Sequence, residues 1–200
     1  MRSANTVQIE SHAAATLRYI RASMDGAASV AVPGSAGIAM GCVGLLATAL
    51  SCTPGLREHW LAIWLLAAAV AAGVGLPLIT QPASLRGLTL SGTPVRKFAL
   101  CLLPTLFAGM ILTAVHGSYG NLHAIPGTWL LLYGCAVIAA STTTNSANLP
   151  IVASMGALFI VLGGAAFLLP ASAHTLLLGV GFGGLHLVSG ILIGRVNHGE

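Results

Sequence analysis

Hydrophobic residues fall into six long stretches without Asp, Glu, Lys or Arg, and polar residues collect between them. A helix needs about 20 mostly apolar residues to cross the ~30 Å hydrocarbon core of a bilayer, and each stretch is about that long. The pattern therefore predicts an all-α fold, a polytopic membrane bundle of six transmembrane helices. The expected spans cover about residues 34–52, 60–80, 98–115, 127–144, 150–169 and 175–194, within a transmembrane domain of residues 31–200.

The first 30 residues are more polar and show a different periodicity. Apolar residues recur there every three or four positions, which predicts an amphipathic helix with a narrow apolar stripe. The stripe consists of Ile9, Ala13, Leu17, Ile20 and Met24. We interpret residues 1–30 as a cytoplasmic segment on the membrane surface, where Arg18 and Arg21 meet anionic lipid headgroups. A short helix packed against the cytoplasmic ends of the bundle is the alternative interpretation.

The composition restricts the class of protein further. The chain of 200 residues is 56% hydrophobic and only 6% charged, whereas soluble proteins carry about 25% charged residues. So few charges cannot cover a water-exposed surface, and they provide no basic face for nucleic acid. The composition therefore excludes a soluble enzyme and a nucleic-acid-binding module, and the lipid bilayer is the expected partner.

Basic residues indicate the orientation, because Lys and Arg are enriched in cytoplasmic loops. With the N-terminus inside, seven of the eight Lys and Arg residues are cytoplasmic, and only Arg57 is outside. Trp60, Trp129 and Tyr119 then lie at the outer interface, at the level that aromatic side chains favour. We expect both termini in the cytoplasm and a location in the inner (plasma) membrane, since outer-membrane proteins are built from short alternating strands.

Small residues form a regular stripe along two of the predicted spans. In the first span the glycines recur at spacings of three and four, and in the sixth span a similar stripe has His186 in its middle. Small side chains let helix backbones approach closely, which is how helices associate inside a bilayer. We expect both spans to be central packing helices, and the stripes either meet each other or meet copies in a second subunit. The glycines are Gly34, Gly37, Gly41 and Gly44 in the first span and Gly179, Gly183, Gly190 and Gly194 in the sixth.

His186 is the candidate functional residue of the transmembrane domain. It is the one His deep inside a predicted span, and ionisable side chains at membrane depth are costly and often functional. The flanking glycines favour a position against a neighbouring helix or in a small cavity. Either His186 is a neutral imidazole hydrogen-bonded across helices, or it contacts a ligand, proton or substrate. Hydroxyl groups at a similar depth belong to Thr105, Tyr133 and Ser154.

No residue pattern indicates a cofactor or catalysis. His186 offers one axial ligand where haem usually needs two, because the other candidate histidines belong to the outer interface or to loops. These are His59, His116, His123 and His174. The four cysteines lack the spacing of a metal site, and no nucleophile motif or pair of carboxylates occurs in the spans. We therefore expect no metal, no cofactor and no catalytic residue, and interpret the chain as a non-enzyme.

The end of the fourth predicted span is polar but uncharged, with Ser, Thr and Asn side chains at residues 141–146 and 148. A solvated loop whose hydroxyl groups cap helix ends is one interpretation of this run. An aqueous vestibule is the other.

Five segments carry a resemblance to a known group of proteins. They are HAAATLRYIR (12–21), VPGSAGIAMG (32–41), PVRKFAL (94–100), PGTWLLLYG (126–134) and GFGGLHLVSG (181–190). In this order they resemble a family of small, uncharacterised six-span bacterial membrane proteins with no assigned function. The resemblance covers nearly the whole chain and implies six spans in a bacterial inner membrane. It implies no catalytic or binding residues.

Three functional classes fit these patterns. The favoured prediction is a non-catalytic accessory, scaffold or oligomeric membrane component, acting as a homo-oligomer or in a larger membrane complex, because of the glycine stripes. The alternative is a small facilitative transporter or channel for a neutral solute, in which spans one to three and four to six form an inverted repeat. The third is a cofactor or redox protein centred on His186.

Overall fold

The computed structural model describes residues 12, 14–17, 29–30, 32–85 and 93–199, and this part of the chain is helical without a β-strand. Six of its helices are long and apolar enough to cross a membrane, which is the number predicted from the hydrophobic pattern. Of the predicted N-terminal stripe only Leu17 lies within the described residues, where it is exposed. Arg18 and Arg21 lie outside the described residues.

The six spans follow one another through short connections. Short 3-10 turns lead into α3, α5 and α7, and Pro126 and Pro150 occupy the first turns of α5 and α6, where a missing N–H costs no hydrogen bond. The fourth span ends at Ser141 rather than at residue 144. The spans are α2 (Gly34–Cys52), α3 (Trp60–Leu85), α4 (Thr93–Ser118), α5 (Ile125–Ser141), α6 (Leu149–Leu168) and a last span built from α7 (His174–Leu178), η4 (Gly179–Leu185) and α8 (His186–His198).

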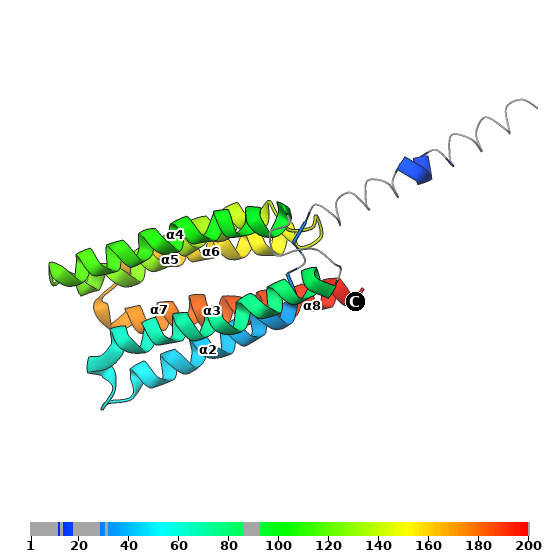
Figure 1. Cartoon of the computed structure of the whole chain (residues 1–200). Helices are drawn as coiled ribbons and strands as arrows, with labels where there is room; N and C mark the ends of the chain where they lie inside the picture. Colours follow the sequence, from blue (N-terminus) through cyan, green and yellow to red (C-terminus); the bar gives the residue numbers. More distant parts are fainter. Residues whose placement is uncertain (1–11, 13, 18–28, 31, 86–92, 200) are drawn as a thin grey trace, which may run out of the picture.

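The spans form two layers of three (Figure 1). In the first layer α2 packs between α3 and the last span, and in the second layer α5 packs between α4 and α6. Contacts between the layers are sparser than contacts within them. The third and sixth spans are therefore exchanged: α4 packs on α5, and the last span packs on α2, each from the other half of the chain.

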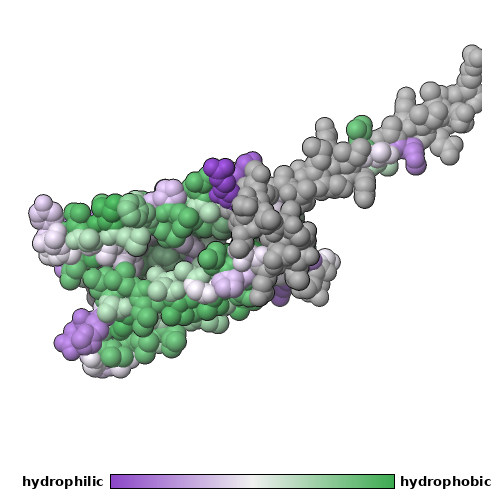
Figure 2. All heavy atoms as spheres, in the orientation of Figure 1, coloured by the Kyte–Doolittle hydropathy of each residue, from purple (hydrophilic) through white to green (hydrophobic). Residues whose placement is uncertain are grey.

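The start of α2 and the end of α8 lie at the same end of the bundle, which we name the terminal end (Figure 1). The turns before α3, α5 and α7 lie at the opposite end. Hydrophobic residues cover the side of the bundle between the two ends, and hydrophilic residues gather toward the ends (Figure 2). On the viewed face Figure 2 also shows a recess between the two layers.

In the first layer, the two glycine stripes meet each other within one chain. A Cβ atom added to Gly37 would lie 2.9 Å from the Cα of Gly190, and one added to Gly41 would lie 2.9 Å from the carbonyl oxygen of Gly183. Gly34 faces the backbone of Gly190 and Gly194 in the same way. Further along, Gly44 meets the backbone of Phe182, and Gly179 faces Thr48. From the sequence the stripes could meet either each other or copies in a second subunit, and in the structure they meet each other.

The second layer contains another close contact between helices, which the sequence analysis missed. A Cβ atom on Gly134 of α5 would lie 2.7 Å from the carbonyl oxygen of Gly156 on α6, and one on Gly156 would lie 2.9 Å from the carbonyl oxygen of Gly134. Such distances are shorter than side chains tolerate, so only glycine permits this approach of the two backbones. Each layer is therefore built around one pair of helices in close contact.

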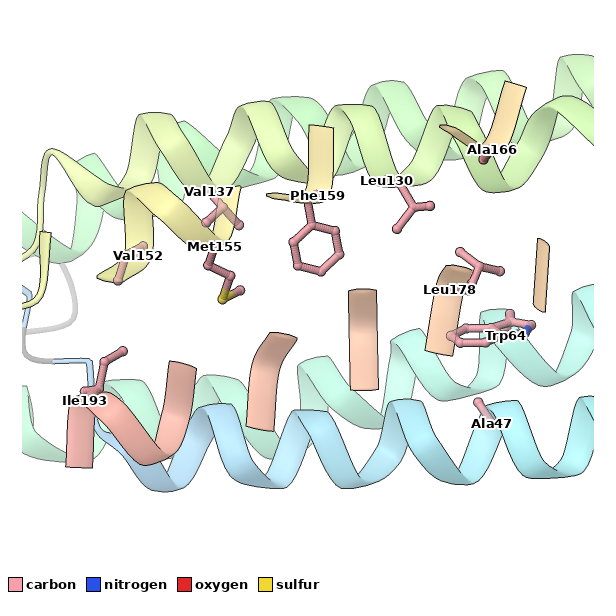
Figure 3. Close-up of a cluster of buried hydrophobic side chains, with 10 residues drawn as sticks. All are labelled: Ala47, Trp64, Leu130, Val137, Val152, Met155, Phe159, Ala166, Leu178 and Ile193. Carbon is pink, nitrogen blue, oxygen red and sulfur yellow. The ribbon is translucent and has the colours of Figure 1, made fainter. Parts of the chain in front are cut away.

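Buried hydrophobic side chains fill the space where the two layers meet (Figure 3). Phe159 and Leu130 of the second layer are fully buried, and they point toward Leu178 and Trp64 of the first layer. Interior packing of this kind fixes how the layers face each other. It also brings the middle of the last span against α5 and α6.

Candidate functional site

The last span is not a regular α-helix. Its middle part, η4, is a π-helix of seven residues between α7 and α8. A π-helix is rare, widens the helical turn and often marks a functional site. Glycines at positions 179, 181, 183 and 184 dominate this segment, and His186 begins the α-helix that follows it. The candidate residue therefore lies directly at a local break in helix geometry.

His186 is hydrogen-bonded across the two layers. Its side chain is 4% exposed, and its Nε2 lies 2.7 Å from the hydroxyl oxygen of Tyr133 on α5. Among the three hydroxyl groups considered from the sequence, Tyr133 is the one that pairs with it. Thr105 donates instead to the carbonyl oxygen of Cys101, and Ser154 donates to the carbonyl oxygen of Ile151.

Two buried polar atoms around this pair lack a hydrogen bond in the described part of the chain. The first is Nδ1 of His186, and the backbone of Gly181 and Phe182 lies close to the same residue. The second is Nε1 of Trp64, whose residue is 3% exposed. Unpaired buried polar atoms are unusual in folded proteins, and each calls for a ligand, a water or a functional explanation.

The two hydrogen-bonded rings pack against two phenylalanines. We name these four residues the aromatic cluster: Tyr133, Phe159, Phe182 and His186. Tyr133 lies 4.8 Å from Phe159 and 5.1 Å from Phe182 between ring centroids, and the His186 ring stacks on Phe182 at 6.2 Å. Trp64 adjoins the cluster through Phe182, at 6.1 Å. Phe159 and His186 are buried, whereas Tyr133 and Phe182 are partly exposed.

At the opposite end of the bundle, two tryptophans connect the layers. Trp60 of α3 stacks on Trp129 of α5 at 6.0 Å with an interplanar angle of 10°, and Nε1 of Trp129 donates to the hydroxyl of Thr113 on α4. Both tryptophans were expected at the membrane interface. Because they also contact each other and α4, they tie three helices together.

The histidines at the opposite end do not form a metal site. The His123 and His174 rings lie 6.3 Å apart, and Nε2 of His174 lies 3.0 Å from the carbonyl oxygen of Ala166. Within the described ranges, no three His, Cys, Asp or Glu side chains lie close enough together to hold a metal ion. His174 is buried, which the assignment to loops or headgroup level did not anticipate.

The polar run at the terminal end is a set of turns whose hydroxyls cap the end of α5, as one interpretation expected, but it is only partly solvated. The hydroxyls of residues 141–144 donate to carbonyl oxygens three residues earlier, Thr142 and Ser146 are exposed, and Ser141, Thr144 and Asn148 are buried. The amide of Asn148 donates to the side chain of Asn197 at the end of α8. The backbone N–H of Val30 donates to the carbonyl of Thr143. The run thus closes the terminal end by joining three separate parts of the chain.

The fold and this site define the class of the protein: an all-helical chain with six helices that are long and apolar enough to cross a membrane, and a His–Tyr pair between two layers. No protein-family model matches the chain, and neither a curated protein nor a solved structure matches it.

Proposed function

We propose that the chain is an inner-membrane protein with both termini in the cytoplasm, and that it acts as a small facilitative transporter for a neutral solute. The observation that carries the proposal is the hydrogen bond between Tyr133 and His186, which joins the two layers near the middle of their spans. The solute would bind beside this pair, where Tyr133 and Phe182 are partly exposed.

The cost of burying polar groups supports this assignment. A polar pair inside a bilayer adds only about 0.6–2 kcal/mol to helix association, whereas packing can join helices without it. Ionisable groups at that depth commonly mark the path of a substrate or ion. The adjacent π-helix and the unpaired Nδ1 of His186 are two further features that packing alone does not require.

The exchange of spans between the layers also supports transport. Many transporters consist of two halves of opposite topology whose substrate site lies at mid-membrane, and they work by rocking one body against the other. Here α4 packs with α5, and the last span packs with α2, as in two halves that exchange their third span. No described residue in the middle of a span is Asp, Glu, Lys or Arg, which favours an uncharged solute.

The glycine stripes give less support to a scaffold or homo-oligomer than their sequence suggested. Both stripes are used inside the chain, so a second subunit or a larger complex would have to bind another surface. If the transport experiment fails, a role as an accessory subunit becomes the favoured hypothesis.

Solute flux in proteoliposomes tests the proposal. We expect urea, glycerol or acetamide to enter protein-containing vesicles faster than empty ones, as measured by stopped-flow light scattering. Tyr133→Phe and His186→Gln should each lower the protein-dependent rate at least about tenfold, equivalent to ~1.4 kcal/mol. Leu103→Ala, on the exposed face of α4, is the matched control and should leave the rate unchanged. Equal rates with and without protein, or unaffected variants, would refute transport through this site.

A further inference from the structure

The Tyr133–His186 pair can both donate and accept a further hydrogen bond. If the Tyr133 hydroxyl donates to Nε2, its oxygen keeps free lone pairs and Nδ1 carries a proton. If Nε2 donates instead, the hydroxyl proton is free and Nδ1 is an acceptor. In either tautomer the pair retains one donor and one acceptor, and Nδ1 makes no hydrogen bond of good geometry within the described residues.

The surroundings of the pair are aromatic. Phe182 is the common neighbour, because Trp64, Tyr133 and His186 all lie within 6.2 Å of it between ring centroids. Aromatic rings prefer tilted or offset neighbours at about 4.5–7 Å, so the partly exposed surfaces of Phe182 and Tyr133 suit another ring at the same spacing. An aliphatic group beside Phe182 and Tyr133 would lack this preferred ring-to-ring geometry.

Charge is absent from these surroundings. The aromatic cluster and Trp64 contain no charged side chain, and the cluster lies near the middle of the apolar spans, where no described residue is Asp, Glu, Lys or Arg. A carboxylate or ammonium group placed here would lose its water without gaining a partner of opposite charge. The site therefore discriminates against ionised molecules.

We infer that the ligand of this site is an uncharged molecule with an aromatic ring directly beside a group that both donates and accepts a hydrogen bond, as in an aromatic primary amide. The ring lies against Phe182 and Tyr133, and the polar group binds the Tyr133–His186 pair. This inference rests on the proposed function, because it names the chemical class of the solute that binds at the same site.

Binding of four small probes to the full chain in lipid nanodiscs tests the inference. The reference probe is benzamide. Relative to it, cyclohexanecarboxamide lacks the aromatic ring, toluene lacks the amide, and benzoate carries a negative charge. Saturation-transfer NMR, with empty nanodiscs subtracted, gives each Kd. We expect benzamide to bind at least about tenfold more tightly than each of the other three. The tenfold threshold corresponds to the ~1.4 kcal/mol that a ring contact or a hydrogen bond contributes.

Two variants separate the contributions of ring and amide. Phe182→Leu should abolish the preference for benzamide over cyclohexanecarboxamide, and Tyr133→Phe should abolish its preference over toluene. Leu103→Ala should change neither preference, and thermal melting of each variant shows whether it is folded. A Tyr133→Phe variant that does not fold is replaced by His186→Gln, which should also lose the preference over toluene.

The outcomes distinguish this inference from the proposed function. Equal Kd values for benzamide and cyclohexanecarboxamide would overturn the aromatic requirement, even if acetamide flux still depends on Tyr133. Tight benzoate binding would overturn the exclusion of charge. Flux that is insensitive to Tyr133 and His186 would instead refute transport itself, whichever probe binds.

Discussion

The two layers each depend on a pair of closely packed helices, but they achieve the contact differently. Along α2 and the last span, both helices contribute glycines, and backbone meets backbone from Gly34 to Gly44. Between α5 and α6 two glycines face each other at one crossing, Gly134 and Gly156, and the backbones also come close beside it, since a Cβ atom on Gly163 would lie 2.8 Å from the backbone nitrogen of Leu131. At the start of α5 the neighbour is a side chain, because Gly127 faces the ring of Phe167. The first contact is therefore a continuous run of glycines on both helices, and the second has facing glycines at one crossing.

This difference determines how each contact responds to an added side chain. In a continuous backbone contact no neighbouring side chain can move aside, so overpacking separates the helices. Where the neighbour is the end of a side chain, a change of rotamer relieves the clash. The following substitutions test the comparison, from the largest expected effect to the smallest.

Gly44→Leu should have the largest effect. A Cβ atom there would lie 2.6 Å from both the carbonyl carbon and the oxygen of Phe182, so α2 and the last span must separate. We expect the free energy of unfolding to fall by about 3 kcal/mol or more, the upper end of the range for overpacked cores. The measurement is the melting temperature, which should drop strongly, or size exclusion, which should show aggregation. Gly73→Leu on α3, where nothing lies within 4 Å, is the control. A Gly44→Leu protein that melts like the control would disprove the continuous contact.

Gly134→Ala should have an intermediate effect. Its methyl group would lie 2.7 Å from the carbonyl oxygen of Gly156 and 2.9 Å from the backbone nitrogen of Ile160, but one methyl group displaces the helices less than a leucine side chain does. We expect a destabilisation of about 1–3 kcal/mol, measured as a lower melting temperature in detergent. Gly164→Ala, which faces open space on α6, should melt like the unmodified protein. No difference between the two variants would show that the crossing is loose.

Gly127→Ala should have the smallest effect. Its methyl group would meet the ring of Phe167, which is 52% exposed and free to rotate outward. The expected change is below about 1 kcal/mol, as for most substitutions whose neighbour can move. A double-mutant cycle with Phe167→Leu measures the interaction, and a coupling well above this limit would contradict the rotation of the ring.

The comparison also explains which packing contact the sequence predicts. The stripe on α2 repeats along the whole helix, and such a repeat is visible in one sequence because every turn contributes to it. The crossing of α5 and α6 has one facing glycine from each helix, and two glycines seven residues apart on each helix, Gly127 and Gly134 or Gly156 and Gly163, make a much weaker pattern than the stripe on α2. The number of spans was also predictable, because the thickness of the bilayer fixes how long an apolar stretch must be to cross it.

The candidate site was predictable only in part. Burial depth selected His186 and three possible hydroxyl partners, but the choice of Tyr133 depends on which helices face each other. The π-helix could not be predicted, because glycines permit an altered hydrogen-bond register without requiring it. The burial of Asn148 also depends on distant residues, since Asn197 and the turn at Val30 cover the polar run. In each case the missing information was long-range packing.

The pairing of α2 with the last span has a consequence for how the protein is made. α2 leaves the ribosome before the other five described spans, yet the glycines that it contacts lie in the last of these spans. At ~5–20 residues per second, the first span waits about 10 to 30 s for its partner, whereas α6 follows α5 at once. During that interval lipid or insertion machinery must cover the glycine face of α2. A nascent chain that stops before His174 would keep its α5–α6 contact and leave the α2 stripe without a partner.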